Sequence, residues 1–268
     1  MTNWPHQTIG SPDQPPIVFL HGFMGRGEDW QPIAEPLSER YYCLMPDLPG
    51  HGKHVDLPLD TPLDFAMIAA ELIAWLDENH LPAVTLVGYS MGGRIALYTA
   101  YHYPQRITQM VLENVNPGLS DASTRQQRTN WDDERAAELL DLGLETFLER
   151  WYNMPLFESL QHQPDLLTQL KQNRRHNQAR WLAKVVADLS PGRQVSLWEQ
   201  LPYLNQPVLL MGGALDTKYV GLLTRMQTML PQSELKIIAH TGHNVHLEQP
   251  ALFINHLTQF LTQGDSHG

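Results

Sequence analysis

Residues 88–92 read Gly-Tyr-Ser-Met-Gly and contain the first side chain that could do chemistry, Ser90. This G-x-S-x-G motif directly follows an apolar run and opens a second apolar pattern with helical spacing. Such a context is typical of a sharp strand-to-helix turn that presents the serine hydroxyl above a sheet. Because a serine hydroxyl is a poor nucleophile or base at neutral pH, Ser90 needs a partner base and an orienting acid.

Chain order predicts those partners, since a turn of this kind is followed along the chain by Asp or Glu and then by His. Asp216 is the only carboxylate between residues 201 and 230. Three histidines, His240, His243 and His246, compete for the role of base. We favour His243, which follows a glycine at the apex of its loop, with His246 as the next candidate.

Two backbone amides are expected to form an oxyanion hole. One belongs to Met91, which follows the serine, and the other to Phe23 in the loop His-Gly-Phe-Met-Gly-Arg-Gly that begins at His21. We expect the Phe23 side chain to form pocket wall and His21 to brace the loop through hydrogen bonds.

Arg94 lies four residues after the serine, at a position where burial of an apolar side chain would cost less free energy. Four residues are about one helical turn, so Arg94 is predicted on the same side of its helix as Ser90. The spacing leaves two interpretations open. Arg94 pairs with a carboxylate of the protein, or it grips a carboxylate of the substrate.

The elements that must position these residues alternate between short apolar runs and longer helical patterns. This alternation predicts an α/β fold with a mostly parallel sheet covered on both faces. Strands are expected at 17–20, 42–45, 84–88, 109–113, 208–211 and 235–239, and helices at 63–79, 92–103, 219–229 and 251–261.

Residues 118–198 interrupt the alternation and predict a helical cap inserted between core segments 1–117 and 199–268. Open α/β sheets place ligands at the carboxyl ends of their strands, where we expect the cap. Its predicted helices are 122–140, 144–152, 165–172 and 178–188. The cap holds eight of the thirteen arginines, with ten Lys and Arg against eleven Asp and Glu. This balance suits an anionic ligand between an acidic body and an arginine-rich cap.

The composition also limits partners and compartment. With a net charge of −11, the chain is not expected to bind nucleic acid or an anionic membrane non-specifically. No run approaches the ~18 apolar residues that span a bilayer. The single cysteine, Cys43, excludes an internal disulfide and favours a reducing, cytoplasmic setting. We expect it to be a core residue.

Five motifs in their order along the chain resemble the α/β-hydrolase superfamily over nearly the whole length. They are HGF at 21–23, DLPGHG at 47–52, GYSMGG at 88–93, GALD at 213–216 and GHNVH…EQP from residue 242. Asp47 is expected to be a structural turn residue. Serine at the turn excludes the chemistry of the aspartate-nucleophile dehalogenases that share this fold.

A narrower resemblance covers about residues 15–262. The strings GYSMGGR, ENVNPGL, RWYNMPLF and GHNVHLE are similar to those of the MenH family, the 2-succinyl-6-hydroxy-2,4-cyclohexadiene-1-carboxylate (SHCHC) synthases. The resemblance implies a carbon–oxygen lyase of menaquinone or phylloquinone biosynthesis. Such a lyase eliminates pyruvate from 2-succinyl-5-enolpyruvyl-6-hydroxy-3-cyclohexene-1-carboxylate, with no cofactor and no metal.

The resemblance also implies substrate-binding residues. Arginines that hold the substrate's carboxylates correspond to Arg94, Arg128 and Arg174, although Arg125 and Arg175 leave the cap register open and extra length precedes Arg174. The aromatic pair of the family corresponds to Trp151 and Tyr152, and Tyr89 is also expected to bind the substrate. From spacing alone, Trp151 and Tyr152 either line the pocket or hold the cap together.

The expected mechanism uses Ser90, primed by His243, as a base and not as a nucleophile. The expected partner is a small anion with several carboxylates, and no obligate protein partner is evident. The same triad could instead serve a hydrolase of an ester, thioester or carbon–carbon bond. A non-catalytic receptor or scaffold of this fold would be expected to lack a triad residue.

Overall fold

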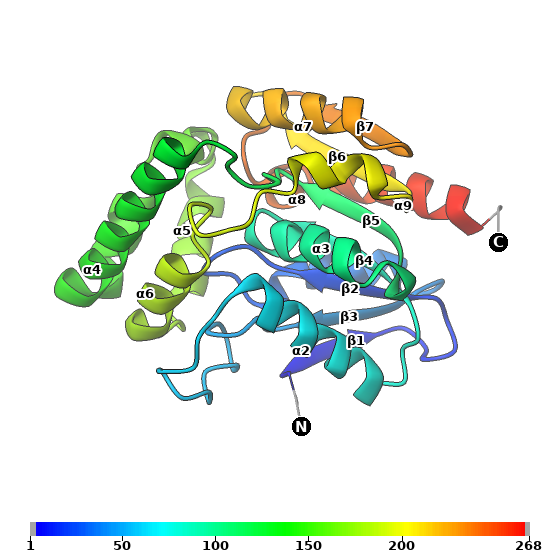
Figure 1. The fold of residues 1–268 in the computed structure, drawn as a ribbon, viewed down its shortest axis with the longest axis horizontal. Helices are drawn as coiled ribbons and strands as arrows, with labels where there is room; N and C mark the ends of the chain where they lie inside the picture. Colours follow the sequence, from blue (N-terminus) through cyan, green and yellow to red (C-terminus); the bar gives the residue numbers. More distant parts are fainter. Residues whose placement is uncertain (1–3, 266–268) are drawn as a thin grey trace.

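A seven-stranded sheet lies between helices in the computed structural model, which describes residues 4–265 (Figure 1). The strand order is β1-β3-β2-β4-β5-β6-β7, with β1 antiparallel to β3 and every other pair parallel. This mostly parallel sheet flanked by helices confirms the predicted fold class. The strands are β1 (His6–Ile9), β2 (Pro16–Leu20), β3 (Tyr42–Pro46), β4 (Val84–Tyr89), β5 (Ile107–Glu113), β6 (Val208–Gly213) and β7 (Ser233–Ile238).

The strands read as continuous apolar runs because both faces of the sheet are covered. Alternate side chains of β2 enter different cores: Val18 and Leu20 face one, and Ile17 and Phe19 face the other. Helices α2 (Phe65–Glu78), α3 (Met91–His102) and α7 (Thr217–Met229) cover the first face. Helices α1 (Gln31–Ala34) and α9 (Pro250–Asp265) cover the second.

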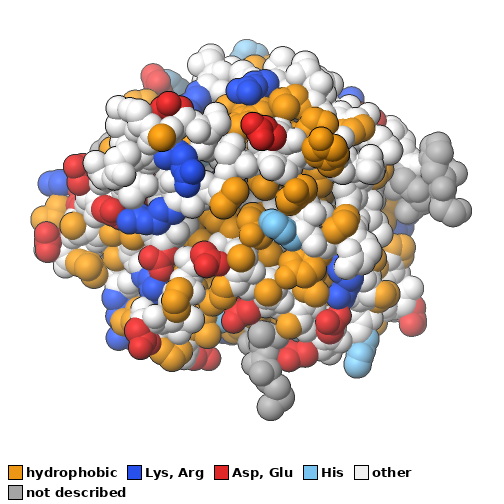
Figure 2. All heavy atoms as spheres, in the orientation of Figure 1, with side chains coloured by type: hydrophobic (Ala, Val, Ile, Leu, Met, Phe, Trp, Pro, Cys, Tyr) orange, Lys and Arg blue, Asp and Glu red, His pale blue; other side chains and the backbone are white. Residues whose placement is uncertain are grey.

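The cap consists of helices α4 (Ala122–Tyr152), α5 (Pro164–Arg174) and α6 (Ala179–Asp188) together with η4 (Pro155–His162). Within the described chain, residues 118–198 contribute no strand. Gly143, with φ 76° and ψ 168°, breaks α4 where the sequence predicts a gap between two helices. The cap has its own apolar core, which includes Leu139 and Leu182, and it lies beside one end of the sheet in Figure 1. Figure 2 shows Lys and Arg side chains interspersed with Asp and Glu on the outer surface of this side of the molecule.

Five short elements complete the described chain. These elements are η1 (Gly27–Trp30), η2 (Glu35–Leu37), η3 (Pro104–Arg106), η5 (Trp198–Tyr203) and α8 (Val245–Glu248).

No helix between residues 4 and 265 is both long and apolar enough to cross a membrane. Cys43 is fully buried, as expected of a core residue, and burial raises the pKa of its thiol to about 12.

Candidate active site

Ser90 occupies a strained turn between β4 and α3. Its backbone has φ 49° and ψ −106°, a conformation that L-residues rarely adopt. The flanking glycines make the turn possible, because a Cβ at Gly92 would lie 2.1 Å from the Leu20 carbonyl oxygen and one at Gly88 2.6 Å from the Gly93 Cα. The G-x-S-x-G spacing is therefore a steric requirement of this turn.

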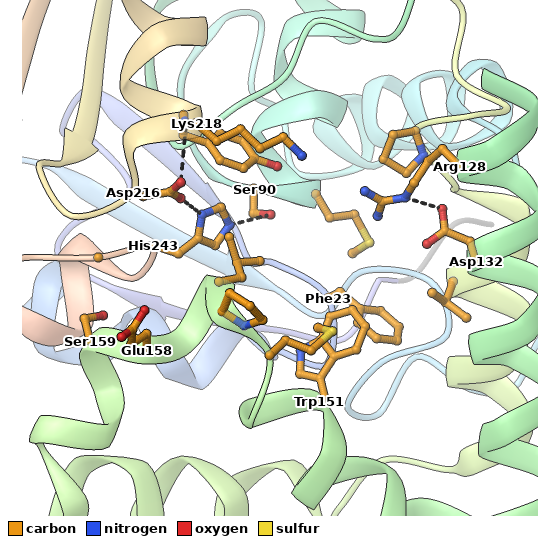
Figure 3. A pocket seen from close by; sticks show the side chains of 18 of the residues that line it. Phe23, Ser90, Arg128, Asp132, Trp151, Glu158, Ser159, Asp216, Lys218 and His243 are labelled. Atoms are coloured by element: carbon orange, nitrogen blue, oxygen red, sulfur yellow. Dashed lines mark hydrogen bonds and ion pairs between the residues drawn. The ribbon is translucent and has the colours of Figure 1, made fainter. Parts of the chain in front are cut away.

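The three residues of the predicted triad meet at the carboxyl ends of the strands (Figure 3). His243 Nδ1 donates to Asp216 Oδ2 over 2.7 Å, and Ser90 Oγ donates to His243 Nε2 over 3.3 Å. Since an ionised carboxylate only accepts, Asp216 fixes the proton of the neutral ring on Nδ1 and leaves Nε2 free to accept. The arrangement can make the Ser90 hydroxyl basic.

Asp216 has a second role, because it is also the N-cap of α7. Its Oδ1 accepts the Tyr219 amide over 3.3 Å, while its other oxygen holds His243. The Tyr219 ring lies 4.6 Å from the His243 ring, centroid to centroid. One carboxylate thus orients both the imidazole and the first turn of the helix beside it.

The loop that carries His243 is held by Glu248. This carboxylate accepts the Gly242 amide over 3.0 Å and the Asn244 amide over 3.2 Å, so it ties down both neighbours of the histidine. Burial raises the pKa of Glu248. The two competing histidines lie elsewhere: His240 is exposed, and His246 is buried with its Nδ1 2.8 Å from a Glu113 oxygen.

The two residues expected to supply the oxyanion hole, Met91 and Phe23, both line the same cavity. Met91 is the first residue of α3, so its amide has no acceptor within the helix. Phe23 lies in the loop after β2. His21 braces that loop by accepting the Leu48 amide over 3.0 Å, and Asp47 braces it by accepting the Gly27 amide over 2.8 Å.

A cavity of about 740 Å³ lies above Ser90, between the sheet and the cap. Among the described residues, no group of three His, Cys, Asp or Glu is placed to hold a metal ion. Of the residues predicted from the sequence, those that line the cavity are Phe23, Ser90, Met91, Arg94, Arg128, Trp151, Asp216 and His243.

Arg94 is buried in the cavity wall and is 9% exposed. Its Nη1 donates to the Leu189 carbonyl over 2.9 Å and to Gln194 Oε1 over 3.1 Å, and its guanidinium lies 5.2 Å from the centre of the Phe65 ring. Within residues 4–265 it makes no ion pair. Burial, and next the charge of Arg128, lower the pKa of Arg94 to about 10. The site therefore holds a cation that lacks an anion.

Arg128 also lines the cavity, whereas Arg125 does not. The Nε of Arg128 donates to the buried Asp132 over 2.7 Å, and Arg125 donates to the Gly192 carbonyl over 3.1 Å. Of the two arginines that the sequence leaves open for this cap position, only Arg128 thus lines the cavity.

Arg174 does not line the cavity, which corrects its predicted placement. It is buried and pairs across the boundary between cap and core with Asp29, Nη1 to Oδ2, over 2.5 Å. Burial alone would raise the pKa of Asp29, but the Arg174 guanidinium, the Arg26 amide and His21 together outweigh it and hold that pKa below its ordinary value. Arg175 is no substitute, because it pairs with Glu145 outside the cavity.

Two predicted tyrosines also lie outside the cavity lining. Tyr152 is buried in the cap core and accepts a hydrogen bond from Arg174. The Tyr89 hydroxyl accepts from Asn244 over 2.8 Å. Tyr89 thus supports the histidine loop from below, and Tyr152 secures the Arg174 pair. Trp151 alone of the predicted aromatic residues in the cap forms cavity wall, 5.2 Å from Phe23 between ring centres.

Several charged or polar lining residues were not predicted from the sequence patterns, among them Asp132, Lys218 and Tyr219. Lys218 and Tyr219 follow the predicted triad acid within three residues, which is a local signal that could have located them. Asp132 lies four residues after Arg128, at the spacing of a helical ion pair, so it could also have been inferred.

Comparison with known proteins shows to which family this chain is similar. The sequence profile of the alpha/beta hydrolase fold matches residues 15–250. The putative SHCHC synthase of Bacillus subtilis is 36% identical over 248 residues, which cover 92% of this chain and 90% of that protein. The SHCHC synthase of Yersinia pseudotuberculosis is 36% identical over 96% of this chain and 90% of its own length.

The structure of MenH from S. aureus matches with a TM-score of 0.93 at 31% identity, covering 97% of this chain and 98% of that one. The chain belongs to the MenH family. This confirms the family predicted from the motifs. The MenH-family chain is also 38% identical to the protein PHYLLO of Arabidopsis thaliana, of which it spans only 15%.

Proposed function

We propose that this chain is a carbon–oxygen lyase that eliminates pyruvate from 2-succinyl-5-enolpyruvyl-6-hydroxy-3-cyclohexene-1-carboxylate to give SHCHC, in the cytoplasm. The observation that carries the proposal is Arg94, a buried cation without an ion-pair partner in the described chain, in the same cavity as the Ser90–His243–Asp216 array. A buried charge is costly unless an opposite charge compensates it. A substrate carboxylate would supply that compensation.

The first step is removal of a proton from the ring carbon next to the succinyl ketone. Ser90 Oγ takes this proton and passes its own to His243 Nε2, while Asp216 holds the imidazolium that forms. The electron pair of the broken C–H bond becomes part of an enolate. Collapse of the enolate through the ring double bond expels the enolpyruvyl group at its ring C–O bond. The released enolpyruvate then takes up a proton and becomes pyruvate.

The Met91 and Phe23 amides stabilise the charge that builds on the ketone oxygen. An oxyanion hole serves an enolate as well as a tetrahedral intermediate, and loss of one donor costs about 2.7–4 kcal/mol of barrier. Since the enolate needs no covalent bond to the enzyme, the mechanism has no acyl-serine. Arg94 and Arg128 hold substrate carboxylates, and Trp151 and Phe23 shield the reacting ring from water.

The test is incubation of the purified chain with the enolpyruvyl substrate while pyruvate and the absorbance of the conjugated diene are followed together. Both should appear at equal rates. Ser90→Ala should lower kcat by about a thousandfold or more, because the array acts as a unit.

The alternative from the same triad is an ester, thioester or carbon–carbon bond hydrolase. An acyl group trapped on Ser90 in mass spectrometry, with no pyruvate released, would establish the hydrolase and contradict the lyase.

A further inference from the structure

Three Lys or Arg side chains line the cavity, and one of them has no role in the proposal so far. They are Arg94, Arg128 and Lys218. The substrate of the proposed reaction carries three carboxylates, on the succinyl chain, on the ring and on the enolpyruvyl group. Arg174 is not available for the third, because it is buried outside the cavity, where it pairs with Asp29.

Lys218 is placed beside the catalytic residues by the first turn of α7. It follows Asp216 by two residues, and its Nζ lies 5.9 Å from the centre of the Tyr219 ring, which in turn lies 4.6 Å from the His243 ring. In Figure 3 the side chains of Lys218 and Arg128 extend over the same opening beside Ser90. The ammonium group therefore shares the reaction space with Arg128.

The charge of Lys218 is uncompensated by the described protein. The residue makes no ion pair within residues 4–265, whereas Lys171, Lys184 and Lys236 all do. Two acids of the cavity wall are engaged, Asp132 with Arg128 and Asp216 with His243. The third, Glu158, is exposed and lies on the far side of His243 from Lys218 in Figure 3.

The Tyr219 hydroxyl adds a second open group to the same cavity. It makes no hydrogen bond to the described chain, although the residue lines the cavity. Burial outweighs the charges of Arg128 and Arg94, so the pKa of Tyr219 is raised and its hydroxyl stays a donor. An ammonium and a phenol that both donate into one space suit a carboxylate.

The depth of the cations suggests which carboxylate binds where. Arg94 is buried, whereas Lys218 is exposed at the cavity rim. The product keeps the succinyl and ring carboxylates, which suit the deeper cations. The enolpyruvyl carboxylate departs, and a cation at the rim can hold it without trapping it inside.

We propose that Lys218, with the Tyr219 hydroxyl of the same cavity, forms the subsite for the carboxylate of the leaving enolpyruvyl group. This inference rests on the proposed function and names the third anion contact of the same site. Lys218 is a binding residue in this scheme, and it takes no part in proton transfer.

The test uses the full chain and compares Lys218→Met, which keeps the length of the side chain and removes its charge, with Lys218→Arg, which keeps a charge. Lys236→Met on β7 is the matched control, since Lys236 is half-buried, pairs only with Glu234 and does not line the cavity. The readouts are KM, kcat and the inhibition constants of pyruvate and of SHCHC.

Lys218→Met should raise KM and the inhibition constant of pyruvate by about tenfold each, the size expected for one charge-assisted contact. The inhibition constant of SHCHC should change by less than about twofold, because that product lacks the leaving group. Lys218→Arg should restore most of the loss, and Lys236→Met should match the wild type.

Unchanged pyruvate inhibition in Lys218→Met would overturn the subsite, and a rise confined to SHCHC would overturn the choice of carboxylate. Failure of the proposed function is distinguishable, since the wild-type chain itself would then release no pyruvate.

Discussion

At the residue scale, the contacts of Arg94 favour a role in binding over a role in the stability of the fold. The guanidinium is buried, donates to two neutral oxygens and faces the cavity that holds Ser90. A buried arginine that served only the fold would be expected to have its charge matched within the protein. Arg106, by contrast, pairs with Asp77 and donates to the Leu81 carbonyl.

Arg94→Gln is therefore expected to damage binding more than folding. KM should rise by at least about tenfold, since a charge-assisted contact is worth about 1.5–3 kcal/mol. The free energy of unfolding should fall by no more than about 2 kcal/mol, because only neutral acceptors lose a donor. Steady-state kinetics and urea unfolding measure the two effects. Arg106→Gln is the opposite control, with lower stability and unchanged KM; the same outcome for Arg94→Gln would contradict the role of Arg94.

Local spacing explains which site residues could be predicted. Ser90, Met91 and Arg94 follow from one short motif, and the chain order of the triad leads to Asp216 and His243. The ion pair of Arg174 could not be predicted, because its partner Asp29 is 145 residues away and nothing in the local sequence marks it. Lys218 was not predicted, because a lysine in the first turn of a helix is usually a solvent-exposed surface residue.

At the element scale, the predicted strands and helices correspond to those observed because each core element is apolar on its buried face. The exception is β1, whose residues His6–Ile9 are largely exposed and polar. Its pairing with β3 at the sheet edge comes from backbone hydrogen bonds, which leave no hydrophobic pattern. The 3₁₀ segment η4 was missed for a related reason, since its eight residues are too few to show a helical period.

Two glycines in open surroundings test the backbone of the helices. A Cβ would meet nothing within 4 Å at Gly143 in the break of α4 or at Gly221 in α7. Gly143 has a positive φ, so Gly143→Ala should lower the free energy of unfolding by about 1–3 kcal/mol. Gly221 is helical, and Gly221→Ala should raise it by up to about 1 kcal/mol. Denaturant unfolding gives both values, and equal effects would argue against the break in α4.

At the scale of the whole molecule, cap and core are joined by the buried pair of Arg174 and Asp29. The two side chains are 7% and 8% exposed, and they connect the end of α5 to η1 after β2. Removing one partner of such a pair leaves an uncompensated buried charge. The arginine predicted to bind substrate thus fastens the cap.

Arg174→Met should therefore lower the free energy of unfolding by about 3–5 kcal/mol at pH 7, and the double variant Asp29→Asn with Arg174→Met should recover much of the loss. The pH dependence follows from the lowered pKa of Asp29. Its contribution is present above the unfolded-state value near 3.8 and is lost as pH falls through the lower folded-state pKa. Urea unfolding of wild type and double variant between pH 7 and 2 measures this. A difference in stability that did not change as the pH fell would contradict the assignment.

Asp216 contacts both the His243 ring and the first turn of α7, which limits how these two parts can move relative to each other. Ser90, His243, Asp216 and Lys218 all belong to the sheet and its adjoining helices, and a single carboxylate anchors both the imidazole and the start of α7. The cap contributes Arg128 and Trp151. Hinging of the cap would therefore change how tightly a bound substrate is enclosed. The distances between Ser90, His243 and Lys218 would stay constant. Substrate entry and proton transfer would then depend on separate parts of the fold.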